Sequence, residues 1–119
     1  MAKTAFFMKR LNDHIQYLKK IDATLNDKGD FQGIDHEECL LGTWLYGEGA
    51  AEIEAIQNSK AKEIFDSLLE PHQKFHTVSR QALANKLAGD EAGVKAALTE
   101  MHLLSTILTN KLLDLDGMS

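Results

Sequence analysis

The chain has 119 residues, of which 44% are hydrophobic and 26% are charged, and its formal net charge at pH 7 is −5. This length is enough to bury a substantial hydrophobic core, so we expect a single domain over residues 1–119. The acidic balance, without a run of Lys or Arg, argues against nucleic acid or an anionic membrane as the main partner, and no stretch is apolar for the roughly 20 residues that cross a membrane.

The first half of the chain predicts one long helix, a loop and one short helix. Residues 4–26 carry an apolar seam at alternating steps of four and three residues. The seam has one histidine within it and consists of Phe7, Leu11, His14, Leu18, Ile21 and Leu25. Two glycines and three aspartates in 26–35 predict a loop. A short helix is then expected over 36–46, with Asp35 as its N-cap and Glu38 in the position of a capping box.

The second half predicts two long helices. One begins near Asn58 or Ser59 and reaches about Ala88, with Pro71 kinking or splitting it. The Glu and Lys residues along 48–63 predict a face turned to solvent. Asp90 is expected to cap the last helix, which runs to about Leu115 with the seam Leu98, Met101, Ser105, Leu108, Leu112 and Leu115. Three long helices and one short helix predict an all-α, up-and-down four-helix bundle with a short second helix.

The pair His72 and His76 is the first indication of a functional site. Residues four apart on a helix lie on one face, about one turn from each other. Two imidazoles in this arrangement are compatible with a shared metal, with a cofactor between them, or with an ordinary place in a core or on a surface. The pair alone does not decide among these.

Two further residues make a metal site possible. His14 lies within the seam of the first helix, and Cys39 is the only cysteine in the chain. Taken singly, a core histidine is usually a hydrogen-bonded structural group, and a free cysteine is usually a small buried hydrophobe. The predicted helix lengths allow His14, Cys39, His72 and His76 to converge halfway along the bundle. Three imidazoles and one thiolate form a closed tetrahedral set that suits Zn²⁺, so a zinc site in the bundle core is compatible with these residues.

The sequence argues against a di-iron site, against an enzyme and against the two other histidines as ligands. No histidine has a glutamate three residues before it, so the di-iron pattern of helical bundles is absent. A closed donor set leaves no position for a water ligand, and we therefore do not expect an enzyme. His36 is the main rival ligand, but its place near a helix start predicts exposure to solvent. His102 adjoins the last seam and is expected to have no role.

The full order of these residues resembles a known family. His14 is followed three residues later by Tyr17, then come Cys39, Leu41, Gly42 and Trp44 in the pattern Cys-x-Leu-Gly-x-Trp, and His72 and His76 close the set. Over residues 14–76 the chain resembles the chemoreceptor zinc-binding domain (CZB), a four-helix bundle of bacterial signalling proteins.

The resemblance implies zinc ligation by His14, Cys39, His72 and His76. It also implies close packing at Gly42 and a core position for Trp44, which is placed to shield the metal. Members are usually fused to a chemoreceptor or a cyclic-di-GMP synthase, for which this chain has no room. The resemblance therefore suggests a stand-alone member.

The expected function is a cytosolic zinc-binding regulatory module in signal transduction, of the kind used in chemotaxis. It would respond to zinc or to oxidation of Cys39, and would act on a chemoreceptor or cyclic-di-GMP signalling protein or by forming a homodimer. A single cysteine, which cannot form an intramolecular disulfide, favours the reducing cytosol. The alternatives are a zinc buffer or structural zinc protein without signalling, a metalloenzyme, and a helical bundle without metal.

Overall fold

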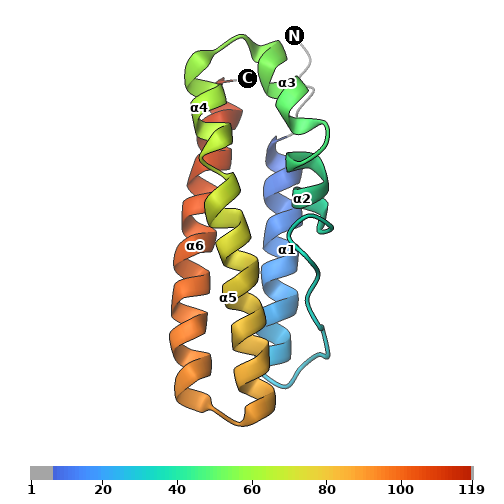
Figure 1. Cartoon of the computed structure of the whole chain (residues 1–119), viewed down its shortest axis with the longest axis vertical. Helices are drawn as coiled ribbons and strands as arrows, with labels where there is room; N and C mark the ends of the chain where they lie inside the picture. The colour runs from blue at the N-terminus through green and yellow to red at the C-terminus, as the bar shows by residue number, and fades with distance from the viewer. Residues whose placement is uncertain (1–6, 119) are drawn as a thin grey trace.

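Long antiparallel helices run along the molecule, as the sequence predicts (Figure 1). The computed structural model describes residues 7–118, and this part of the chain contains helices and no strand. The helices are α1 (Phe7–Leu25), α2 (Leu40–Leu45), α3 (Gly49–Ile56), α4 (Ser59–Asp66), α5 (Leu69–Ala88) and α6 (Glu91–Met118). The molecule is a rod of about 50 × 20 × 19 Å. The expected all-α bundle is confirmed.

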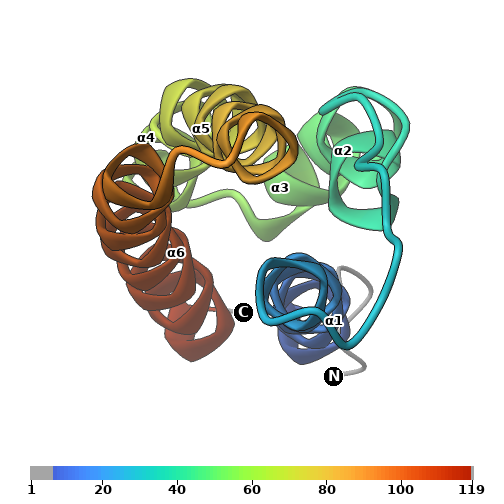
Figure 2. The same cartoon turned by 90° about the horizontal axis from the view of Figure 1, so that it is seen from below.

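Long helices form three corners of the bundle, and a short helix with an irregular connection forms the fourth. Helices α5 and α6 form an antiparallel hairpin, and α1 packs against both of them (Figure 2). The fourth corner holds α2, which follows an irregular connection over residues 26–39 (Figures 1 and 2). The short second helix predicted from the sequence therefore occupies only part of the fourth side. No helix within residues 7–118 is long and apolar enough to cross a membrane.

The expected boundaries of the long helices are largely confirmed. Asn58 caps α4 by accepting hydrogen bonds from the N–H groups of Lys60 (2.9 Å) and Ala61 (3.3 Å). The predicted long helix is split before Pro71, which then lies in the first turn of α5, where its missing N–H costs nothing. Asp90 Oδ1 accepts from the N–H of Gly93 at 2.9 Å at the start of α6. The last helix ends at Met118 rather than near Leu115.

The start of the short second helix was predicted incorrectly. Residues 36–38 form a turn, and α2 begins at Leu40. The carbonyl of Asp35 closes this turn, while its side chain pairs with Arg80 at 2.8 Å. Asp35 is therefore not the N-cap. Cys39 takes that position, because its Sγ accepts a hydrogen bond from the N–H of Gly42.

Helix α3 was not expected, because its glutamates and flanking glycines resembled an exposed, irregular stretch. Gly49 and Ile53 of this helix are buried, and they give it an inner face. Lys60, Lys62 and Glu63 in α4 are exposed, as predicted for the solvent-facing part of 48–63. Glu52 differs: it is half-buried and accepts a hydrogen bond from Trp44 Nε1 at 3.3 Å.

The core follows the predicted seams. In α1 the buried residues include His14 within an otherwise largely apolar face, and in α6 they include Ser105. The largest fully buried apolar side chains are Phe7, Ile21, Leu41, Ile53, Leu68, Phe75, Met101, Leu108, Leu112 and Leu115. The polar residues enclosed in this apolar surrounding are His14, His72, His76, Ser79 and Ser105. Burial of polar groups requires hydrogen-bond or metal partners, so these residues mark the part of the bundle where a functional site is expected.

Candidate metal centre

Cys39 lies where the irregular connection meets α2. It is buried, and its Sγ accepts the N–H of Gly42 at 3.2 Å and lies 3.6 Å from the carbonyl oxygen of His36. Burial raises the pKa of the Cys39 thiol, although the backbone N–H groups of Gly42 and Leu41 act in the opposite direction. Without a nearby cation the sulfur is therefore held as a thiol. A bound metal would supply the positive charge that stabilises the thiolate.

His72 and His76 lie one turn apart on α5, as the spacing predicts. Both are buried, and their ring centroids are 4.8 Å apart. His72 Nε2 is 3.3 Å from Cys39 Sγ. One potential ligand atom from each of Cys39, His72 and His76 lies within 4.8 Å of the others. The structure thus brings three of the four predicted ligands into one buried group.

The Nδ1 atoms of His72 and His76 differ in their surroundings. His76 Nδ1 is 2.9 Å from the carbonyl oxygen of Ile34. A carbonyl only accepts, so Nδ1 carries the proton and Nε2 keeps its lone pair, the arrangement usual for a metal-binding histidine. His72 Nδ1 is a buried nitrogen without a hydrogen-bond partner among the described residues. The nitrogen of His72 that lies beside the buried thiol is Nε2, and the sulfur–nitrogen donor set that Cys39 and His72 form there fits zinc.

The buried histidines are neutral at physiological pH. Burial first, and then the proximity of His76, lower the pKa of His14 to about 4. Burial and neighbouring histidines lower the pKa of His72 to about 3. Burial also dominates at His76, whose pKa is lowered to about 4. Neutral imidazole is the form that binds a metal, so these rings need lose no proton to do so at pH 7.

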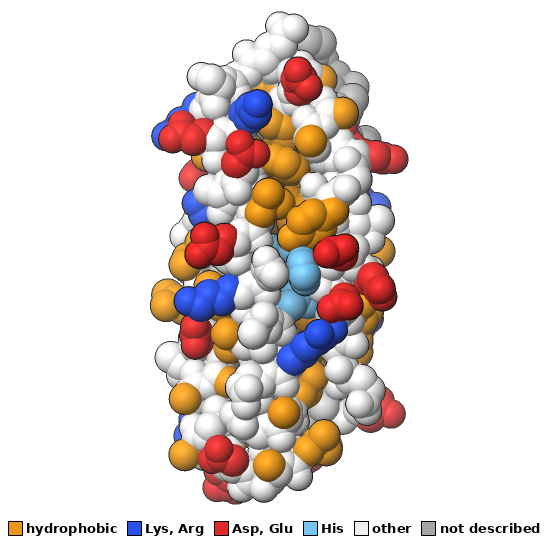
Figure 3. Space-filling model, viewed as in Figure 1, with side chains coloured by type: hydrophobic (Ala, Val, Ile, Leu, Met, Phe, Trp, Pro, Cys, Tyr) orange, Lys and Arg blue, Asp and Glu red, His pale blue; other side chains and the backbone are white. Residues whose placement is uncertain are grey.

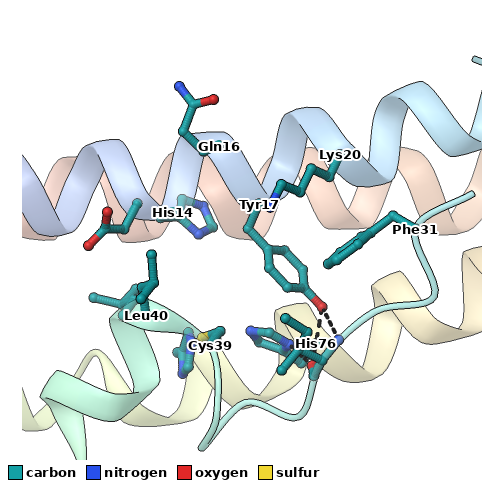
Figure 4. A pocket seen from close by; sticks show the side chains of 12 residues that line it. His14, Gln16, Tyr17, Lys20, Phe31, Cys39, Leu40 and His76 are labelled. Atoms are coloured by element: carbon teal, nitrogen blue, oxygen red, sulfur yellow. Dashed lines mark hydrogen bonds between the residues drawn. The ribbon is translucent and has the colours of Figure 1, made fainter. Parts of the chain in front are cut away.

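His14 lies on the wall of the same cavity but outside the three-residue group. The cavity has a volume of about 80 Å³, and His14 of α1, Cys39 and His76 line it together with His72 (Figure 4). His14 Nε2 is 2.8 Å from Ser105 Oγ, and its ring packs edge-on against Phe75 at 4.8 Å. Of the four residues predicted to converge, Cys39, His72 and His76 lie at close range. His14 lines the same cavity as a neighbour of this group.

His36 is less exposed than its position near a helix start suggested. Its side chain is 22% exposed, and its ring centroid lies 6.3 Å from that of His72 and 6.4 Å from that of His76. Figure 3 shows histidine side chains reaching the surface about halfway along the rod, beside acidic side chains. His102 is exposed, and its Nε2 lies 3.1 Å from Asp22 Oδ1, so its contact is with a residue outside this group. His36 is thus the remaining rival for a place at the centre.

Gly42 and Trp44 occupy the positions expected of them. A Cβ atom on Gly42 would lie 1.7 Å from the carbonyl oxygen of His36, so the expected close packing is confirmed. Trp44 is buried and packs edge-on against Phe7 and Phe65. These contacts confirm its core position.

Sequence reasoning missed two groups that hold the site. The carbonyl of Ile34 is a backbone group, and no side-chain motif reveals it. Ser105 was assigned to the seam of the last helix without a role of its own, yet it bonds His14 from 91 residues away. A serine within an apolar seam was the only available signal, because a buried hydroxyl needs a partner.

Comparison with known proteins agrees with this geometry. The family model of the chemoreceptor zinc-binding domain matches residues 14–83, a range that includes all four predicted ligands. Searches of curated proteins and of solved structures found no match to the chain.

Proposed function

Because the chain belongs to the chemoreceptor zinc-binding domain family, we propose that it is a regulatory module in which His14, Cys39, His72 and His76 bind one zinc ion. The observation that carries the proposal is the buried group of Cys39, His72 and His76, whose ligand atoms lie within 4.8 Å of one another. The approach of His72 Nε2 to within 3.3 Å of Cys39 Sγ supports it further.

His14 is the fourth ligand in this proposal because it lines the same cavity and is neutral at pH 7. Ser105 Oγ then accepts from Nε2–H of His14, the ring nitrogen that does not face the metal, as outer partners of metal-binding histidines do. Four protein ligands leave no open position for a water molecule. The module is accordingly not an enzyme, and its output is a change of conformation or of partner.

The regulatory signal is either the availability of zinc or oxidation of Cys39. The thiolate is the ligand most readily oxidised under mild conditions. Hydrogen peroxide would transfer one oxygen to Sγ and leave as water, giving a sulfenic acid that is a poorer ligand. The chain has one cysteine, so an external thiol or another chain has to restore it. A reducing cytosol would supply such thiols, and we place the module there.

The partner in this proposal is a chemoreceptor-type or cyclic-di-GMP signalling protein, or a second copy of the chain. A zinc buffer or a purely structural zinc protein is the second candidate. The burial of Cys39 favours this second candidate, since a thiol that reacts with oxidants needs exposure as well as thiolate character. Titration of the zinc-loaded protein with peroxide tests the oxidation signal. Release of zinc together with oxidation of Cys39 supports a redox sensor, whereas methionine oxidation with zinc retained excludes it and leaves zinc availability as the signal. A conformational change that depends on a partner then separates a zinc sensor from a buffer or structural protein.

The metal assignment is tested by elemental analysis of protein purified without added metal. We expect one zinc per chain in the wild type and a large loss in Cys39→Ser, His72→Ala and His14→Ala. His102→Ala is the matched control and is expected to keep its zinc. His36→Ala distinguishes the two rivals for the fourth position: zinc lost in this variant and retained in His14→Ala would exchange their roles. Stoichiometric zinc in a variant lacking both Cys39 and His72 would refute the assignment.

A further inference from the structure

Tyr17 lies beside the candidate centre without being a candidate ligand. It is buried on α1, and its ring centroid is 4.7 Å from that of His76 and 5.1 Å from that of Phe31. A buried tyrosine hydroxyl needs hydrogen-bond partners. In this structure it finds them on the backbone of the irregular connection that leads to Cys39 (Figure 4).

Two hydrogen bonds of the hydroxyl join Tyr17 to Ile34. The hydroxyl accepts the N–H of Ile34 at 2.9 Å and donates to its carbonyl oxygen at 3.2 Å. The same carbonyl accepts Nδ1–H of His76 at 2.9 Å. Its two lone pairs are therefore shared between Tyr17 and His76. The orientation of His76 depends on a carbonyl that is held in place from α1.

The connection over residues 26–39 has no regular secondary structure, so individual side chains determine where it lies. Phe31 N–H donates to Thr24 Oγ1 at 2.9 Å near its start, and the exposed Asp35 pairs with Arg80. Between these two ties, the Tyr17 hydroxyl holds Ile34. An exposed ion pair such as Asp35–Arg80 contributes little to stability in water. Breaking a buried hydrogen bond is costly, because it leaves a buried polar group without a partner.

We propose that the Tyr17 hydroxyl is a positioning group for the metal centre, because it holds the Ile34 carbonyl that orients His76. This inference rests on the proposed function, namely that His76 binds zinc. Partners that orient metal-binding histidines typically change metal affinity by roughly 10- to 100-fold when they are removed. Tyr17 acts through one intervening carbonyl, so we expect the lower end of this range, about 10-fold.

The test uses the two tyrosines of the chain as a matched pair. Tyr17→Phe removes only the hydroxyl and keeps the ring contacts with His76 and Phe31. Tyr46→Phe removes a hydroxyl from a ring that lies 6.4 Å from that of His72 but is 44% exposed. Zinc affinity is measured by competition with a chromophoric chelator. The same proteins are loaded with Co²⁺, whose visible absorption reports ligand geometry, and thermal unfolding of the metal-free proteins records any general loss of stability.

We expect Tyr17→Phe to bind zinc about 10-fold more weakly and to show an altered Co²⁺ spectrum, with Tyr46→Phe unchanged in both. Wild-type affinity and a wild-type Co²⁺ spectrum in Tyr17→Phe would overturn the inference, even if its metal-free form unfolds at a lower temperature. An equal loss of affinity in Tyr46→Phe would overturn it as well. Failure of the wild type to bind zinc would instead refute the proposed function, so the two failures are distinguishable.

Discussion

Substitution of Gly42 by alanine is expected to disrupt the candidate centre from a position that binds no metal. The added Cβ would lie 1.7 Å from the carbonyl oxygen of His36, 2.8 Å from its carbonyl carbon and 3.3 Å from Cys39 Sγ. Ordinary contacts of a Cβ atom begin at 3.4 Å, so the oxygen has to move by about 3.4 − 1.7 = 1.7 Å. The obstacle is backbone, which cannot swing aside as the end of a side chain can.

The required movement displaces the turn that ends in Cys39. A metal site tolerates changes of only about 0.2 Å in its ligand distances, roughly one eighth of the movement required. Losing the cysteine as a ligand is expected to weaken zinc binding by at least about 100-fold, the upper end of the effect of losing an outer partner. At about 1.4 kcal/mol per factor of ten, this corresponds to about 3 kcal/mol.

The free energy of unfolding of the metal-free protein is expected to fall by less than this loss of zinc-binding free energy. Overpacking costs about 1–3 kcal/mol, and the better helix propensity of alanine returns up to about 1 kcal/mol. Zinc affinity is measured by chelator competition, and stability by urea unfolding with chelator present. Gly117→Ala is the control, because a Cβ there would meet nothing within 4 Å. Zinc affinity in Gly42→Ala within tenfold of the wild type would show that the turn adapts and would refute the reasoning.

Two further predictions concern the protein without metal. Burial lowers the pKa values of His14, His72 and His76 below their ordinary value of 6.5; below that pH the unfolded chain binds more protons, and the free energy of unfolding falls. At pH 5.5 each buried histidine contributes a loss of about 1.4 kcal/mol, or about 4 kcal/mol for the three. Urea unfolding in chelator at pH 7.5 and 5.5 measures this, and equal stability at both values would contradict the burial of neutral rings. Removal of zinc is also expected to deprotect the backbone amides of α2 more than those of α1, α5 and α6, because α2 depends on its tie through Cys39. Hydrogen exchange with and without zinc tests this, and a uniform change across all helices would exclude it.

The residues of the centre were largely predictable because local spacing encodes them. Four-residue spacing placed His72 and His76 on one face of a helix, and burial of both follows from the apolar seam around them. The position of His14 in the seam of α1 likewise predicted its burial. The cap at Asn58 and the break before Pro71 depend on side chains and ring geometry that act within a few residues.

The remaining features depend on contacts that the local sequence does not encode. Helix α3 is held by the burial of Ile53 in the core, and its composition alone resembles an exposed stretch. Cys39 replaces Asp35 as the cap because residues 36–38 form a turn and α2 begins only at Leu40, while the Asp35 side chain pairs with Arg80, 45 residues away. The support of His76 by the Ile34 carbonyl spans 42 residues and uses a backbone atom. Such tertiary contacts override local preferences, which is why the fold and the burial of the candidate ligands were predictable while the contacts that support them were not.

The separation of Cys39 from His72 along the chain has a consequence for folding. These residues are 33 positions apart, and bringing the ends of such a segment together costs roughly 3 kcal/mol of chain entropy. The α5–α6 hairpin, in contrast, forms from contacts close in sequence, and such contacts form fast. We therefore expect His72 and His76 to reach their places with the hairpin, before Cys39 joins them. A zinc ion bound first by His72 and His76 would then bind Cys39 and cross-link it to α5. Closing the loop between them would be a late step of folding that depends on the metal.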